Sequence, residues 1–99
     1  MALFVISWFD KPGSLEARMA AREAHLAYIA RHADAVRLGG PFLDSEGRMA
    51  GSMILLEAES IAEAQAFHAA DPYKLAGLFE TSNVTPWRMT VGLGLPAKS

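Results

Sequence analysis

The stretch LFVISWFDKPGS at residues 3–14 sets the plan of the chain. Its first seven residues are apolar except for one serine and rich in β-branched and aromatic types, which is typical of a strand. We expect both faces of that strand to be buried. Pro12 and Gly13 end it, and Ser14 can then cap a helix, because apolar residues recur at helical spacing over 14–33.

A hairpin and a second helix are predicted next. Short apolar segments at 35–43 and 51–58 are joined by polar residues and a glycine, which indicates two antiparallel strands. Ser60 and Glu63 have the spacing of a reciprocal capping box. The helix that begins there is expected to run to about residue 70.

The last third of the chain is interrupted by Asp71 and Pro72. Proline disfavours a helical residue before it but suits the first position of a new helix, so a short helix is predicted over 72–76. Apolar residues alternate over 81–93, which predicts the final strand. Pro86 lies inside that segment and marks an edge strand or a bulge.

The order strand, helix, strand, strand, helix, strand is the split βαβ plan. We therefore predict an α+β fold, a ferredoxin-like βαββαβ sandwich with two helices on one face of an antiparallel sheet. One domain should span 1–95, with 96–99 as a loose tail. No third layer is available for the other sheet face, and 52% of the residues are apolar. A second copy stacked across a two-fold axis is the simplest cover, which predicts a homodimer.

Composition argues against several kinds of partner. The net charge is −2 and the basic residues are scattered, so no nucleic acid partner is expected. The apolar start lacks a basic leader and is too short to span a membrane, so no membrane partner is expected. The chain has no cysteine, which excludes thiolate chemistry and fits a cytoplasmic location. His32 and His68 stand apart from carboxylates and no phosphate-binding loop occurs, so we expect no metal and no cofactor.

His25 and Asp71 are the main candidates for chemistry. His25 lies at the rim of the apolar face of the first helix, beside Arg18 and Arg22. Such a histidine is more often a packing residue bonded to a backbone carbonyl, and an aspartate before Pro72 is explained by helix capping. If the two side chains met, the carboxylate would orient the imidazole and free its other nitrogen for proton transfer. Arginine on a helix is usually solvated, and the sequence leaves open whether either one reaches a ligand.

The predicted hairpin contains further polar and flexible positions. Ser52 can hydrogen-bond a ligand, although serine at a strand start is more often part of local turn structure. Gly39, Gly40 and Pro41 can let a ligand approach the backbone. A bulge or tight bend at these three residues is our default interpretation.

Three aromatic residues are candidates for the wall of a ligand pocket. Tyr73 follows the break between the later helices, whereas Phe42 and Trp87 lie in predicted strands. Most aromatic residues in a domain of this size are core or dimer contacts, so the pocket role is a hypothesis.

Six short motifs follow one another along nearly the whole chain: REAHLAY at 22–28, GGPF at 39–42, GS at 51–52, DPY at 71–73, AGLF at 76–79 and PW at 86–87. Their order and spacing resemble the YciI-like (YCII-related) family. The resemblance implies a dimeric α+β barrel with a ferredoxin-like protomer. It also implies an active-site pair formed by His25 and Asp71.

Our leading hypothesis is a cofactor-free enzyme, a lyase or an isomerase, in which His25 held by Asp71 moves a proton on a small cyclic or enolisable substrate. The resemblance supports isomerisation or elimination, because a chlorinated-hydroquinone dehydrochlorinase belongs to the family and muconolactone isomerases share the general fold. The residues expected to contact the substrate are Arg22, Gly40, Pro41, Ser52 and Tyr73. The alternative is a non-catalytic module that binds a small molecule or another protein through the same pocket. Cofactor-independent oxygenation, which dimeric α+β barrels of other families perform, ranks third.

Overall fold

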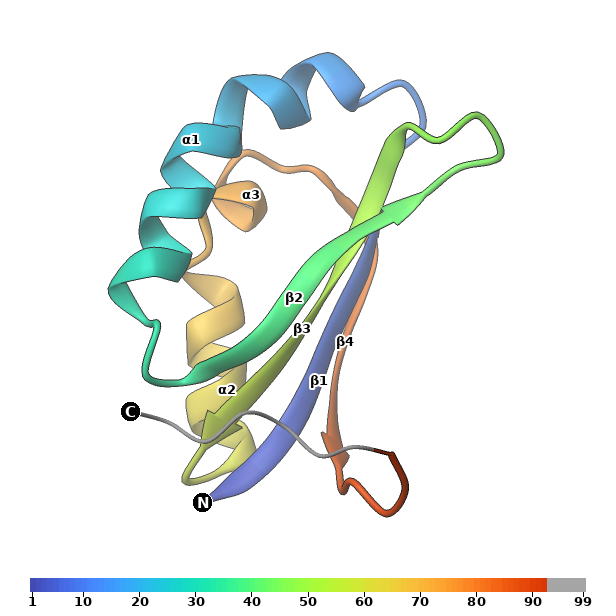
Figure 1. Cartoon of the computed structure of the whole chain (residues 1–99). Coiled ribbons are helices and arrows are strands. Elements are labelled where there is room, and N and C mark those ends of the chain that lie inside the picture. Colours follow the sequence, from blue (N-terminus) through green and yellow to red (C-terminus); the bar gives the residue numbers. More distant parts are fainter. Residues whose placement is uncertain (93–99) are drawn as a thin grey trace.

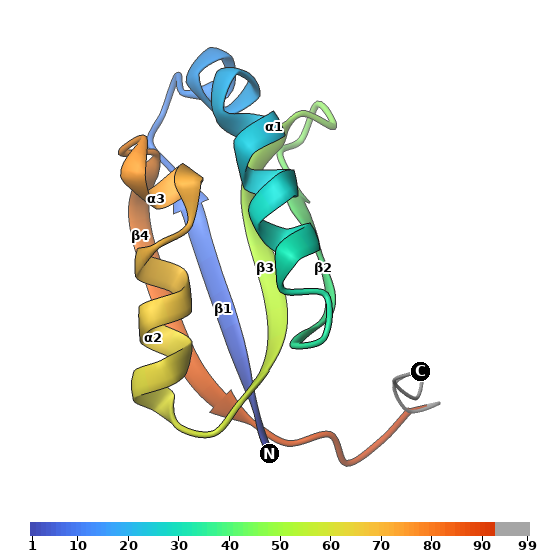
Figure 2. The same cartoon turned by 90° about the vertical axis from the view of Figure 1, so that its left-hand side faces the viewer.

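The computed structural model describes residues 1–92 and shows a four-stranded sheet with its helices on one face (Figure 1 and Figure 2). The elements in chain order are β1 (Ala2–Asp10), α1 (Leu15–Arg31), β2 (Val36–Leu43), β3 (Met49–Ala58), α2 (Ile61–Ala69), α3 (Pro72–Leu75) and β4 (Phe79–Trp87). The strands lie in the order β2-β3-β1-β4, and each neighbouring pair is antiparallel. The predicted α+β fold with ferredoxin-like βαββαβ order is confirmed. Among the described residues, no helix is long and apolar enough to cross a membrane.

The core lies between the helices and one face of the sheet. Phe4, Ile6 and Trp8 of β1 point into it and are at most 4% exposed. Val5 is only half-buried and Phe9 is 55% exposed. The expectation that both faces of this strand are buried was therefore wrong for the single chain, because the three helices all cover the same face.

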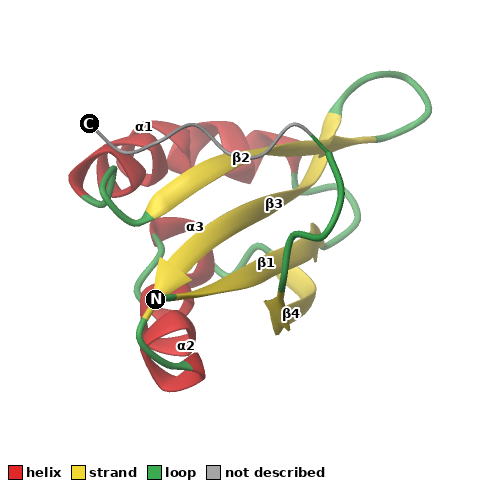
Figure 3. Cartoon of the chain, turned by 60° about the horizontal axis from the view of Figure 1, so that its bottom comes forward, coloured by secondary structure: helices red, strands yellow, loops and turns green. Residues whose placement is uncertain are grey.

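The other face of the sheet carries exposed apolar side chains. Figure 3 shows this face with the helices behind it. The rings of Phe9 and Phe42 stack there with their centroids 5.0 Å apart. Leu38 and Trp87 are 44% and 42% exposed. These side chains form a wide apolar surface that a single copy of the chain leaves in contact with water.

Local side-chain bonds start two of the helices where the sequence predicted. The Ser60 hydroxyl accepts a hydrogen bond from the Glu63 N–H at 3.2 Å at the start of α2. The Asp71 carboxylate accepts one from the Tyr73 N–H at 2.9 Å at the start of α3. Ser14 precedes α1 as expected, but its side chain makes no capping bond.

The last strand differs from the prediction. β4 runs from Phe79 to Trp87 rather than over 81–93, and the described residues after it are not in a strand. The length of the neighbouring strand β1 explains why β4 ends at Trp87. Trp87 pairs with Leu3, and only one residue of β1 lies beyond Leu3. The end of the predicted strand at Leu93 and the predicted tail at 96–99 lie outside the described residues.

The two edge strands contain the residues for which we predicted irregular pairing. Pro86 lies in β4 at one edge of the sheet, which fits the edge-strand prediction. The bulge expected at residues 39–41 was wrong, because that stretch of β2 pairs with β3 in regular register. The register shifts instead at 36–38 and 42–43, on either side of it.

Candidate active site

A cavity of about 160 Å³ opens between α1, β2, β3 and the start of α3. On the sheet side, β2 contributes Gly39 and Pro41 to its wall, and their small bulk leaves room for the cavity. Every substrate-contact residue predicted from the sequence lines it, together with the predicted base: Arg22, His25, Gly40, Pro41, Ser52 and Tyr73. Tertiary structure thus brings residues from four elements around one space.

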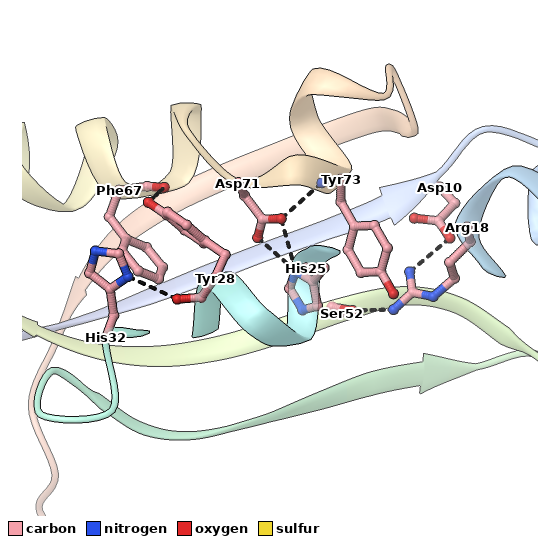
Figure 4. A network of polar contacts seen from close by, with 9 residues as sticks. All are labelled: Asp10, Arg18, His25, Tyr28, His32, Ser52, Phe67, Asp71 and Tyr73. Atoms are coloured by element: carbon pink, nitrogen blue, oxygen red, sulfur yellow. Dashed lines mark hydrogen bonds and ion pairs between the residues drawn. The ribbon is translucent and has the colours of Figure 1, made fainter. Parts of the chain in front are cut away.

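His25 and Asp71 form a hydrogen bond behind the cavity wall although they lie 46 positions apart (Figure 4). His25 Nδ1 is 2.8 Å from Asp71 Oδ1 and 3.0 Å from Oδ2. A carboxylate only accepts, so in the neutral imidazole Nδ1 carries the proton and the lone pair is on Nε2. The alternative of a backbone carbonyl as the partner of His25 was wrong. Asp71 is 0% exposed and also caps α3, so its capping role and its contact with His25 coexist.

An aromatic stack holds the imidazole in place. The rings of His25 and Tyr73 lie 4.0 Å apart and nearly parallel, at 14°. The Trp8 ring meets both of them edge-on at 6.2 Å. Burial raises the pKa of the Tyr73 hydroxyl above its usual 10.0, while Arg18 and Arg22 act in the opposite direction. Tyr73 therefore keeps its proton at neutral pH and offers a donor to the cavity.

Arg18 is a buried part of the site rather than a solvated side chain. It is 2% exposed, donates to Asp10 Oδ2 at 2.9 Å and donates a second hydrogen bond to the Ser52 hydroxyl. Its guanidinium also lies over the Tyr73 ring, 4.7 Å from the centroid. Asp10 was missed by the sequence analysis. The signal that could have placed Arg18 was its position two helical turns before His25, on the same face of α1.

Two of the three aromatic candidates lie away from the cavity. Phe42 stacks on Phe9 at the opposite face of the sheet. Trp87 pairs with Leu3 at the far end of β1. Neighbouring residues of a strand point to opposite faces, so Phe42 points away from the cavity that Pro41 lines. Only Tyr73 has the predicted place.

His68 is a buried histidine that lies next to the site, although we expected it to stand apart from carboxylates. Its ring stacks on Phe79 at 5.0 Å and lies 5.6 Å from Trp8, and neither ring nitrogen has a hydrogen-bond partner among the described residues. Burial lowers the pKa of His68 from its usual 6.5, although the charge of Asp71 opposes the shift. His68 is therefore neutral at pH 7. Within residues 1–92, no group of three or more histidine or acidic side chains could hold a metal ion.

The fold and the site together define a class of small α+β proteins in which a histidine, held by a buried aspartate, faces a cavity of roughly the size of one ring. The chain belongs to the YCII-related domain family, which matches residues 2–88. The resemblance drawn from the sequence motifs is confirmed.

Known proteins similar to this chain include one with a named activity. Protein YciI of Escherichia coli is 42% identical over 94 residues, which cover 87% of this chain and 96% of that protein. The 5-chloro-2-hydroxyhydroquinone dehydrochlorinase of Burkholderia phenoliruptrix, solved in complex with 2,5-dihydroxybenzoquinone, is 38% identical. It superposes with a TM-score of 0.85 over 89% of this chain and 95% of that one. A protein of Agrobacterium tumefaciens, 19% identical with a TM-score of 0.55, covers 99% of this chain and 100% of its own and shows the fold alone.

Proposed function

We propose that this protein is a cofactor-free enzyme in which His25 transfers a proton on a small cyclic substrate, in an elimination or an isomerisation. The observation that carries the proposal is the 2.8 Å hydrogen bond between His25 Nδ1 and the buried Asp71 carboxylate. In the neutral ring this bond leaves Nε2 unprotonated, which is what a general base requires, and His25 lines the cavity. A positioned base of this kind typically contributes about 10²- to 10⁴-fold in rate.

The cavity supports a substrate with a single ring. Its volume is about 160 Å³, and its lining includes the apolar side chains of Leu26, Ile29 and Ile54. An apolar cavity of about 150 Å³ is large enough to hold benzene. The similar dehydrochlorinase acts on a chlorinated hydroquinone and was solved with a hydroxylated quinone. We therefore propose hydroxylated or enolic single-ring compounds, including chlorinated hydroquinones, as the substrate class.

The reaction needs only proton and electron-pair shifts. In an elimination, a ring hydroxyl first loses its proton and the carbon that bears chlorine gains one, so that the oxygen becomes a carbonyl. His25 Nε2 then accepts the proton of a second hydroxyl, its O–H electron pair moves through the ring, and chloride leaves with its bonding pair. The net change is loss of HCl, and the ring becomes a quinone. In an isomerisation, the same nitrogen returns the proton to another carbon. In both cases the imidazolium that forms between the steps is stabilised by the Asp71 carboxylate, which is 0% exposed and therefore weakly screened.

Arg22 is the side chain at this cavity best placed to attract an acidic substrate. It lines the cavity, is exposed, and makes no hydrogen bond or ion pair in the part of the chain that the structure describes. The charge of Arg18 is by contrast already paired with Asp10. We propose that Arg22 favours binding of phenolate or enolate forms, an effect that salt should weaken.

Turnover of 5-chloro-2-hydroxyhydroquinone, followed by chloride release, tests the proposal directly, with enolic lactones assayed in parallel. His25→Ala is expected to lower kcat by about 10²-fold or more while the far-ultraviolet spectrum stays unchanged. His32→Ala is the matched control, because His32 follows the end of α1 and does not line the cavity. A wild-type protein that binds these compounds without converting them would be a binding module, and oxygen uptake would instead indicate oxygenation.

We further propose that a second copy of the chain covers the open face of the sheet. The surface is apolar and extends over all four strands, from Leu38 and Phe42 of β2 to Trp87 of β4. A sheet of the same shape is its simplest complement, because two such faces stack across a two-fold axis. The cavity lies on the helix side, so this interface leaves the proposed active site within each protomer.

A further inference from the structure

We infer that Ser52 donates a hydrogen bond to a substrate oxygen that gains negative charge during the reaction, and that Arg18 is the positioning residue that holds Ser52 in this role. The inference rests on the proposed enzymatic function and adds a second polar group to it. His25 would act on the proton, and Ser52 would act on the oxygen.

The direction of the Ser52 hydroxyl bond follows from the chemistry of arginine. A guanidinium has only donors, so the Arg18 side chain donates and the Ser52 oxygen accepts. The hydroxyl proton is not used in that bond, and the residues that the structure describes offer it no acceptor. Ser52 is 4% exposed and lines the cavity, so a ligand there is the partner available to this proton.

Two contacts besides the bond to Ser52 hold the Arg18 side chain in the wall of the cavity. Its Asp10 contact is an ion pair of 2.9 Å between side chains that are 2% and 5% exposed. Its guanidinium also covers the Tyr73 ring. The ion pair adds no net charge to the site. What Arg18 contributes is a polarised and oriented Ser52 hydroxyl, because a hydrogen bond from a cation strengthens the donor ability of the group that accepts it.

The register of the sheet places this hydroxyl opposite the base. Ser52 pairs with Trp8 on one side and Pro41 on the other, so its side chain is on the face that the helices cover. His25 reaches the same cavity from α1 above that face (Figure 4). One ring in a cavity of about 160 Å³ can contact both groups. When His25 removes a proton, the charge that develops on a ring oxygen is stabilised by a donor already in place.

The inference narrows the substrate class. A substrate needs an acidic proton for His25 and a separate oxygen, a phenol or a carbonyl conjugated to the same ring, for Ser52. Dihydroxylated rings and cyclic enones meet both requirements. A ring with a single hydroxyl does not, and it should be a much poorer substrate than its dihydroxylated analogue.

Steady-state kinetics of Ser52→Ala, Arg18→Lys and the double variant test the inference. Loss of one preorganised donor of this kind lowers kcat by about 10²-fold, with KM within about threefold of wild type. Lysine keeps the charge beside Asp10 but lacks the fork that reaches two acceptors, so Arg18→Lys should fold and lose a similar factor in kcat. The double variant should be no slower than Ser52→Ala, because Arg18 acts through Ser52 and Ser52→Ala already removes the hydroxyl that Arg18 orients. Ser82→Ala, at an exposed position of β4 that does not line the cavity, is the matched serine control.

Binding of 2,5-dihydroxybenzoquinone by titration calorimetry provides a second readout that needs no turnover. Ser52→Ala should weaken it by about tenfold, the loss of one hydrogen bond to a charged oxygen. If kcat and the affinity of Ser52→Ala both stayed within about twofold of wild type, the role of Ser52 would be refuted while the proposed function would stand. The role of Arg18 would be refuted if the factors lost in kcat by Arg18→Lys and Ser52→Ala multiplied in the double variant. A wild-type protein with neither turnover nor binding would overturn the proposed function, and the inference with it.

Discussion

Asp71→Asn separates the catalytic contribution of the Asp71 carboxylate from its structural one. The asparagine oxygen can still accept from the Tyr73 N–H and from His25 Nδ1, which now lie 2.9 Å and 2.8 Å from Oδ1. The negative charge is lost, and an amide NH2 replaces Oδ2, which lies 3.0 Å from His25 Nδ1. Because hydrogen bonds to charged groups are worth about 1 kcal/mol more than neutral ones, we expect unfolding free energy to fall by that amount.

The effect on catalysis should be larger. Without the carboxylate, the imidazolium formed at His25 loses its stabilising charge, and kcat should fall by about 10²-fold or more, equivalent to about 2.7 kcal/mol of activation free energy. Asp71→Ala removes the cap and leaves a buried N–H unpaired, so it should also lower unfolding free energy by about 3 kcal/mol.

Urea unfolding and kcat, measured on the same preparations, check both expectations. Glu23→Gln is the control, because it removes one exposed carboxylate from α1 without breaking a hydrogen bond given by the structure. The reasoning fails if Asp71→Asn keeps kcat within about threefold of wild type, or if its loss of activity is matched by an equal loss of folded protein.

Three further predictions concern other parts of the molecule. Burial lowers the pKa of His68 from 6.5, so the unfolded chain takes up a proton before the folded one does. The free energy of unfolding should therefore decrease as the pH falls below 6.5. Urea unfolding at several pH values should show a smaller decrease in His68→Gln than in wild type. An equal dependence on pH in the two proteins would contradict this. A Cβ at Gly51 would collide with the Trp8 carbonyl oxygen, whereas one at Gly40 meets nothing within 4 Å. Gly51→Ala should lower unfolding free energy by about 2 kcal/mol and Gly40→Ala by much less, and similar melting temperatures for both would refute the argument. Phe9→Asp places a charge on the open sheet face, so it should convert the proposed dimer into a monomer. Analytical ultracentrifugation gives the mass, and an unchanged mass would place the interface elsewhere.

Interactions between near neighbours in the chain were predictable. The capping bond of Ser60 and the helix break at Pro72 depend on residues within one helical turn, so their spacing alone carries the information. The first strand and the order of elements followed from composition and turn residues. The motifs also indicated the family, and with it the pair of residues worth testing as a site.

Features that depend on a partner strand were predicted less well. The end of β4 is set by the length of β1, and the register shifts of β2 are set by its pairing with β3. β1 is far from β4 in sequence, and although β3 follows β2 directly, the register of their pairing cannot be read from either strand alone. For the same reason Phe42 and Pro41, adjacent in the chain, were assigned together to the pocket although they face opposite sides of the sheet.

The α+β plan, the helix starts and the candidate residues His25 and Asp71 could all be predicted from the amino-acid sequence. The structure was needed to show that these two side chains meet, that Arg18 is buried on Asp10, and that Ser52 faces the same cavity. His25 and Asp71 lie far apart along the chain, and so do His25 and Ser52. A hydrogen bond across 46 residues exists only after α1 and α3 pack on one sheet face, and that packing follows from burial of the whole core.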